Sequence, residues 1–223
     1  EGAFSECSSL ENVVIQDGVT EIASNAFYWC LSLQEITIPG SVEVIGAECF
    51  AKCSRLKNVV LCYGIMSIGY RAFYNCIHLE NIIIPNSVKI IEKETFLSCE
   101  SLTNVTIPDS VTDIGDAAFC GCKGLVSVKI GNNLTYIGNQ MFYECSSLTS
   151  IIIPDSVFVI GERAFSGCKS LTKLSIGDNV TTIGDAAFWG CSNLPKVYIP
   201  ENVNKIGKST FSSCNSLTEF KGQ

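Results

Sequence analysis

The sequence has only one histidine, His78, among 223 residues. Because no second His is present, any Ser-His-Asp or Cys-His catalytic centre would depend wholly on this side chain, which lies between Ile77 and Leu79. Neither a Walker loop nor a dinucleotide-binding fingerprint occurs, and no pair of carboxylates stands out from the ordinary variation between repeats. We therefore expect His78 to be a surface residue, and the chain to be a non-enzyme without catalytic residues or cofactors.

Long apolar runs and clustered basic residues are also missing. No stretch reaches the roughly 18 apolar residues that a transmembrane helix needs, so the sequence predicts no direct membrane insertion. The net charge of −7 argues against nucleic acid as a partner, since phosphate binding requires clustered Lys and Arg.

The basic residues that do occur are unevenly placed. Residues 1–50 hold eight Asp and Glu and no Lys or Arg, whereas the remainder has 14 acidic against 15 basic residues. One end of the molecule should therefore be acidic. Two interpretations stay open at this point: a solvated end that aids solubility, or a docking patch for a basic partner or for cations.

What the sequence does have is a period of 23 residues, which three columns follow without interruption. Phe stands at 4, 27, 50, 73, 96, 119, 142, 165, 188 and 211, Cys at 7, 30, 53, 76, 99, 122, 145, 168, 191 and 214, and Leu at 10, 33, 56, 79, 102, 125, 148, 171, 194 and 217. A fixed period of this size is typical of repeat proteins whose units stack on one another. We expect residues 1–223 to form one solenoid domain of about ten rungs. Since both ends of the chain fall inside repeats, we also expect it to be a fragment of a longer protein.

The spacing of apolar residues inside one unit predicts its local structure. Val105 and Ile107 are two residues apart, the period of a strand with one buried face. Pro108 then predicts a corner, and Gly115 a second turn with a positive φ. Asp116 would cap one or two helical turns over the A-F-x-x-C segment. The predicted fold is a mainly β solenoid of parallel stacked strands with short helical turns.

The Cys column allows two interpretations. Stacked rungs would bring successive Cys Cα atoms to about 5 Å, within the range for disulfides. However, the side chains should point in parallel into the core, and pairing would make equivalent rungs alternate. We expect buried, reduced thiols that act as small apolar fillers. A metal site is not expected, because the column supplies one thiol per rung along a line, rather than four converging ligands.

The repeat unit resembles the BspA-like class of leucine-rich repeats. Residues 102–122, LTNVTIPDSVTDIGDAAFCGC, carry its Leu, Pro, Gly, Phe and Cys positions, and the match extends over essentially the whole chain. The resemblance implies a cell-surface or secreted protein of a host-associated bacterium or a parasitic protist. It also implies adhesion, with a protein ligand such as a host surface or matrix protein as the partner.

Partner binding in a solenoid must use the solvent-facing positions that vary between rungs. On the first strand of each unit we expect these candidates: Val14, Thr37, Val60, Ile83, Thr106, Lys129, Ile152, Ser175 and Tyr198, together with Asn81, Asn104, Lys173 and Lys196. A second strand offers another exposed ribbon: Val44, Met66, Ile90, Tyr136, Phe158 and Val159. The first is favoured by the family resemblance. The alternatives are a structural rod that self-associates end to end and an intracellular scaffold.

Overall fold

The computed structural model describes residues 1–222 and forms a rod of stacked rungs, which we number 1 to 10 by the column Phe that each contains. Each complete rung has two short strands. The first-strand set is β2 (Glu35–Ile38), β4 (Asn58–Leu61), β6 (Asn81–Ile82), β8 (Asn104–Thr106), β10 (Ser127–Lys129), β12 (Ser150–Ile152), β14 (Lys173–Ser175), β16 (Lys196–Tyr198) and β18 (Glu219–Lys221). The second-strand set is β1 (Glu21–Ile22), β3 (Val44–Ile45), β5 (Ser67–Ile68), β7 (Ile90–Ile91), β9 (Asp113–Ile114), β11 (Tyr136–Ile137), β13 (Val159–Ile160), β15 (Thr182–Ile183) and β17 (Lys205–Ile206).

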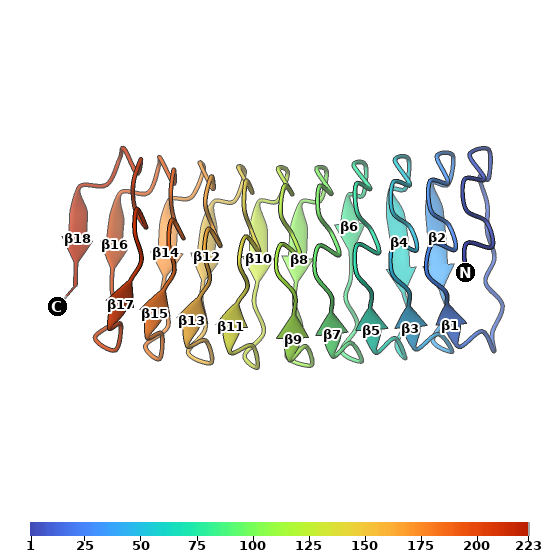
Figure 1. Ribbon diagram of the computed structural model, residues 1–223, viewed down its shortest axis with the longest axis horizontal. Coiled ribbons are helices and arrows are strands. Elements are labelled where there is room, and N and C mark those ends of the chain that lie inside the picture. The colour runs from blue at the N-terminus through green and yellow to red at the C-terminus, as the bar shows by residue number, and fades with distance from the viewer. Residues whose placement is uncertain (223) are drawn as a thin grey trace.

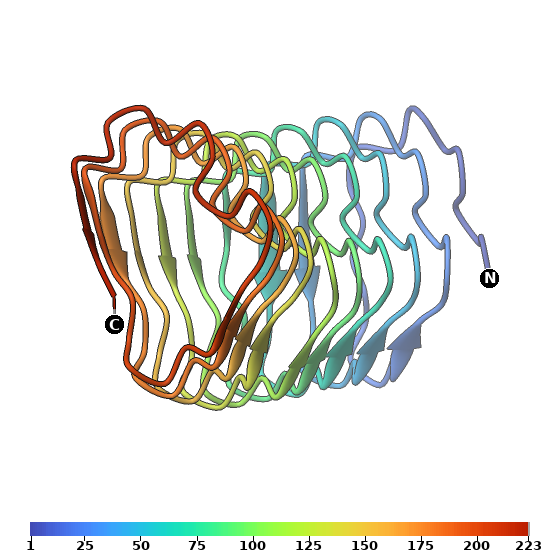
Figure 2. The same cartoon turned by 60° about the vertical axis from the view of Figure 1, so that its left-hand side comes forward.

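Every strand pairs with its equivalent in at least one neighbouring rung, and all pairs are parallel. Glu35 lies opposite Asn58 and Glu21 opposite Val44, so each residue pairs with the one 23 positions further along. The even-numbered and odd-numbered strands form two separate rows along the rod, with the chain termini at opposite ends (Figures 1 and 2). The parallel β-solenoid expected from the period is therefore confirmed.

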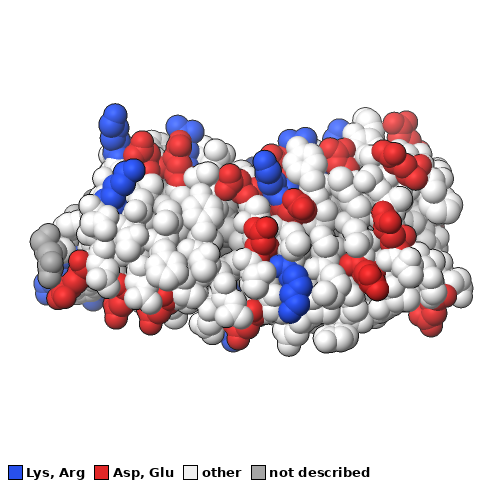
Figure 3. Space-filling model, turned by 60° about the horizontal axis from the view of Figure 1, so that its bottom comes forward, with Lys and Arg blue, Asp and Glu red and all other residues white. Residues whose placement is uncertain are grey.

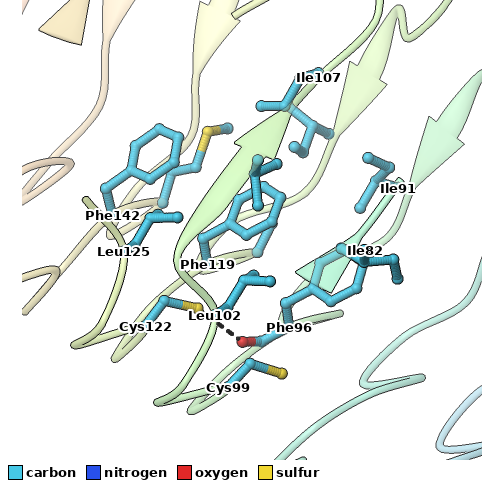
Figure 4. Close-up of a cluster of buried hydrophobic side chains, with 14 of the residues drawn as sticks. Ile82, Ile91, Phe96, Cys99, Leu102, Ile107, Phe119, Cys122, Leu125 and Phe142 are labelled. Atoms are coloured by element: carbon cyan, nitrogen blue, oxygen red, sulfur yellow. Dashed lines mark hydrogen bonds between the residues drawn. The ribbon is translucent and has the colours of Figure 1, made fainter. Parts of the chain in front are cut away.

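The core is a set of straight columns that run the length of the rod. The ten column Phe rings stack nearly parallel, with centroids 5.1 to 5.7 Å apart from Phe4 to Phe211. The column Leu side chains, which precede the first strands, and Ile side chains in and beside both strands pack beside this stack (Figure 4). Because each ring contacts only the rings above and below it, the packing links neighbouring rungs more than distant ones.

The short helical turns expected over A-F-x-x-C are not present in the described residues, where the segment is a run of tight turns. The N–H groups of Asn25, Phe27 and Trp29 donate to carbonyls of the next rung at 2.8 to 2.9 Å, while those of the residues between them bond within the rung. This alternation requires a positive φ at Asn25 (58°) and Trp29 (59°). A helix would use all these N–H groups internally and would leave the rung-to-rung ladder incomplete.

The positive φ predicted for the recurring Gly was placed at the wrong residue. Left-handed backbone occurs two positions later, for example at Glu48 (53°) and Arg71 (53°), and not at Gly46 or Gly69. The glycines are required for a different reason, which is the close approach of the preceding rung. A Cβ on Gly46 would lie 2.5 Å from the backbone nitrogen of Ser24. Gly is therefore selected here by space between rungs.

Each row of strands is interrupted once. The first-strand row divides into a seven-stranded sheet from β2 to β14 and a pair of β16 with β18. Pro195 precedes β16 and has no N–H, whereas Thr172 at the same position donates to Thr149 of the rung before it, at 2.9 Å.

The second-strand row divides between β9 and β11. Here the carboxylate of Asp116 spans the gap, accepting bonds from the backbone N–H of Asn139 at 2.8 Å and from its Nδ2 at 3.2 Å. Asp116 therefore serves the neighbouring rung, and not the N-terminus of a helix as expected from the sequence.

Candidate protein-binding face

The thirteen candidate side chains on the first strands are all exposed. Val14, Ile83 and Ile152 are the most open of the apolar ones, at 80%, 80% and 71% exposure. Their chain neighbours Ile82 and Ile151 point the other way and are 5% and 2% exposed. This alternation follows from the pleat of a strand with one buried side, and it confirms the predicted division between core and surface.

Strand pairing brings most of these residues into a continuous surface. Asn81 lies opposite Asn104, which lies opposite Ser127, and the hydroxyl of Ser127 donates to Oδ1 of Asn104 at 2.6 Å. Val14 precedes the first assigned strand of this row, and Ile83 follows the end of β6. We call this surface, made of the exposed side chains in and beside the even-numbered strands, the first-strand face.

Two shallow hollows lie on the first-strand face beside the corner turns. One extends over rungs 1 to 3, with Val14 and Val60 among its lining residues and Asp17 and Glu35 also present. The other extends over rungs 4 and 5, beside Ile83 and Pro108. Both are open depressions rather than enclosed cavities, so the face suits an extended macromolecular surface more than a small molecule.

Charge is separated along the first-strand face. The acidic residues Glu11, Glu35 and Glu80 lie in rungs 1 to 4 with one basic residue, Lys57. At the strand positions of rungs 6 to 10, Lys129, Lys173, Lys196 and Lys221 accompany one acidic residue, Glu219, while the corner turns beside these strands add the exposed acidic residues Asp155, Asp178 and Glu201. The acidic end is also visible on the side of the rod that bears the odd-numbered strands, where red side chains outnumber blue ones toward the N-terminus (Figure 3).

Most charged side chains at the basic end are not neutralised within the chain. Glu219 is an exception, because it accepts from Nζ of Lys221 at 3.1 Å and from the hydroxyl of Tyr198 at 3.3 Å. The hydrogen bond with Lys221 lowers the pKa of the Glu219 carboxyl. Lys196 and Lys221 also lie over the Tyr198 ring, with Nζ 5.7 and 5.6 Å from its centroid. The exposed ring of Tyr198 therefore makes cation–π contacts with two lysine side chains on this face.

The second exposed ribbon is present as expected but is less open. Phe158, Met66 and Val44 are 48%, 42% and 39% exposed, while Tyr136 and Val159 are half-buried. Its strands are two residues long, and the row is divided near the middle.

An aromatic and cationic cluster on the turn side of the rod was missed by the sequence reasoning. Nζ of Lys52 lies 5.3 Å from the Tyr28 ring centroid and 5.0 Å from that of Trp29. The guanidinium of Arg71 lies over two further rings, Tyr70 and Tyr74. The available signal was the position after the column Phe, which holds Tyr or Trp in four rungs.

The thiols of the Cys column are free, and all except the exposed Cys7 are buried and do more than fill space. From Cys30 to Cys214, each Sγ–H donates to the carbonyl oxygen of a Phe in the preceding rung, as Cys122 does to Phe96 at 3.2 Å (Figure 4). Burial raises the pKa of the Cys53 thiol to about 12 and that of Cys30 to about 11. These thiols therefore stay protonated near neutral pH and are poor nucleophiles.

His78 is exposed, with Nδ1 2.6 Å from the carbonyl oxygen of Ser54 in the neighbouring rung. The described residues contain no group of three or more His, Cys, Asp or Glu placed to hold a metal ion. Nor do they include a helix with the length and hydropathy to cross a bilayer.

Comparison with known proteins identifies a matching family and solved structures that resemble this chain. Residues 1–103 and 89–218 match the family described as BspA type leucine rich repeat region. A leucine-rich repeat protein of T. pallidum is 30% identical, with 91% of this chain and 74% of that chain covered and a TM-score of 0.56. One from Bacteroides ovatus is 27% identical, with 98% and 74% covered and a TM-score of 0.61.

A more distant relative shares the fold alone. The pneumococcal vaccine antigen PcpA is 20% identical, with 90% of this chain and 53% of that chain covered and a TM-score of 0.56. No curated protein matches the sequence.

Proposed function

Since the chain belongs to the BspA-type leucine-rich repeat family, we propose that it is a non-catalytic protein-binding module that engages its ligand through the first-strand face. Leucine-rich repeat proteins are generally non-catalytic and generally mediate protein interactions. The observation that carries the choice of face is the apolar column Val14, Val60, Ile83, Ile152 and Tyr198, which is 45 to 80% exposed. Exposed apolar side chains gathered on one surface are typical of interaction sites.

The same proposal includes location and ligand class. We place the parent protein at the cell surface or among secreted proteins, where members of this family act in adhesion, and the ligand among host surface or matrix proteins. Family membership supports this placement. The shape and charge of the first-strand face favour a protein ligand, because this face is long and shallow and carries both signs of charge.

A binding assay with matched variants tests the proposal. The purified chain is immobilised and probed with a panel of host matrix and plasma proteins. The double variant Ile83→Glu/Ile152→Glu should abolish saturable binding, because it introduces charge into the apolar column without changing the core.

The control is Met66→Glu/Phe158→Glu, which places the same charges on the second ribbon and should bind like the unaltered chain. Binding that survives the first double variant but is lost in the second would move the site to the second ribbon. Absence of binding to every panel member would contradict the host-ligand proposal.

A further inference from the structure

We infer that the first-strand face also binds a second copy of this chain, with the two rods face to face and running in opposite directions. The inference rests on the proposed function, because it uses the same surface, and it names one partner for that surface. The observation that carries it is the separation of charge along the face, with Glu11, Glu35 and Glu80 toward one end and Lys129, Lys173, Lys196 and Lys221 toward the other.

Symmetry limits how two copies can pack through one face. A two-fold axis that lies along the strand direction turns one face against the other, reverses the order of rungs and keeps each position of the strand opposite itself. A two-fold axis along the rod keeps the order of rungs and places each rung against its own copy. Both are closed, self-complementary dimers, so charge must distinguish them.

The reversed arrangement opposes unlike charges. With its centre between rungs 5 and 6, Glu35 of rung 2 faces Lys196 of rung 9 in the second copy, and each such pair occurs twice. Glu11 lies in the rung that faces rung 10, where Thr218 occupies the position opposite it and Lys221 is paired with Glu219. In the unreversed arrangement each rung faces its own copy with the strand direction inverted, so the Glu35–Lys196 pair cannot form, and Glu35 approaches the second Glu35 as Lys196 approaches the second Lys196. Like charges brought close together at an interface are unfavourable.

The apolar side chains fit the same register. Ile83 of rung 4 faces Ile152 of rung 7 in the second copy, so the two large aliphatic side chains on this column, 80% and 71% exposed, cover each other twice. Thr37 faces Tyr198, and the hydroxyl or amide side chains Asn81 and Asn104 face Ser150 and Ser127. The complementary charged and apolar contacts therefore lie in rungs 2, 4, 7 and 9, while Thr106 faces Lys129 at the centre and Val14 faces Lys221 at the ends.

The area of the first-strand face indicates the range in which the dissociation constant of the dimer should lie. Ten rungs at about 4.8 Å give a rod of roughly 45 Å, and a four-residue strand is about 13 Å long. Each copy would therefore bury roughly 600 Å², and both about 1,200 Å², which is the low end for a specific complex. We expect a reversible dimer with a dissociation constant in the micromolar range, on the order of 1 to 100 μM, that weakens as salt is added.

Charge reversal with mixing tests the arrangement. Glu35→Lys and Lys196→Glu are made as separate variants, and their masses are measured by light scattering and sedimentation. Each variant alone would oppose like charges twice, so its dissociation constant should rise about tenfold or more. An equimolar mixture of the two should form a heterodimer, because both opposed pairs then carry unlike charges. Glu43→Lys and Lys205→Glu, whose exposed side chains lie on the second ribbon, are the matched controls and should dimerise like the unaltered chain.

A photoreactive residue at Ile83 reports the register directly. Cross-links to rung 7 of the second copy support reversed rungs, and cross-links to rung 4 overturn them. A chain that stays monomeric up to about 1 mM, or variants that do not recover on mixing, would also overturn the inference. If such a monomeric chain still bound a panel protein through Ile83 and Ile152, the proposed function would stand while the dimer was rejected.

Discussion

Removing one ring from the middle of the Phe stack should destabilise the rod far more than removing a ring at its end. Phe119 is fully buried, with ring centroids of Phe96 and Phe142 at 5.1 and 5.7 Å. Truncation of a buried Phe to Ala costs about 3 to 5 kcal/mol, because apolar contact is lost and a cavity remains. Phe119→Ala should lie near the upper limit, since the ring packs against a neighbour on both of its faces.

Phe4 provides the comparison within the same column. Its ring is 48% exposed and has one stacked neighbour, Phe27, at 5.3 Å. Phe4→Ala should cost about 1 to 1.5 kcal/mol, because roughly half of the side chain already contacts water. The free energy of unfolding is measured by urea denaturation followed by circular dichroism, with hydrogen exchange to locate the loss along the rod.

The spatial pattern provides the stricter test. Since rungs couple to their neighbours, exchange protection in Phe119→Ala should fall most in rungs 5 to 7 and least at the ends. Equal loss of stability in the two variants, or uniform loss of protection along the rod, would refute the account of the core as a column of nearest-neighbour contacts.

Three further predictions concern other parts of the rod. In the folded protein at pH 8, a thiol reagent should modify Cys7 rapidly and leave the buried column unmodified until denaturant is added, because burial raises the pKa of those thiols; mass spectrometry counts the labels. Gly115→Ala should lower the free energy of unfolding by about 2 to 4 kcal/mol, since the new Cβ would lie 2.3 Å from the backbone nitrogen of Lys93. Gly190→Ala should lower it by about 1 kcal/mol, because only the positive φ is unfavourable there; urea unfolding of both variants gives the comparison. Pro195→Thr should supply the missing N–H donor and join β14 to β16, which hydrogen exchange would detect as new protection at residue 195; an unprotected amide there would show that Pro195 does not cause the break.

The period of 23 residues was enough to predict the fold, because it fixes which residues stack. Once Phe96 and Phe119 are equivalent, their rings must lie one rung apart, and Val105 must pair with Val128. The alternation of Val105 and Thr106 then determines which side chain is buried and which belongs to the first-strand face. Core and candidate face were both available without coordinates.

The turns could not be predicted in the same way, because their conformation depends on hydrogen bonds between rungs. The segment Ala118 to Cys122 has the spacing of a helical turn when a single unit is considered. In the stack, the N–H of Phe119 donates to Met141 of the next rung, at 3.0 Å, and this bond excludes the helical partner. Local propensity was overruled by a contact 22 residues away in the chain, which a single repeat does not encode.

The difference between the two sets of columns explains why the face was predicted and its ligand was not. Column residues such as Phe119 and Cys122 recur because every rung imposes the same contacts on them. Exposed residues such as Thr106 and Lys129 have no such constraint, so in the proposed function their variation would select the partner. That variation is distributed along the length of the rod, as a gradient of charge and a pair of separated isoleucines. A single substitution changes only one rung, whereas a second copy of the chain contacts all rungs at once. For this reason, mixing Glu35→Lys with Lys196→Glu is more informative than any single substitution.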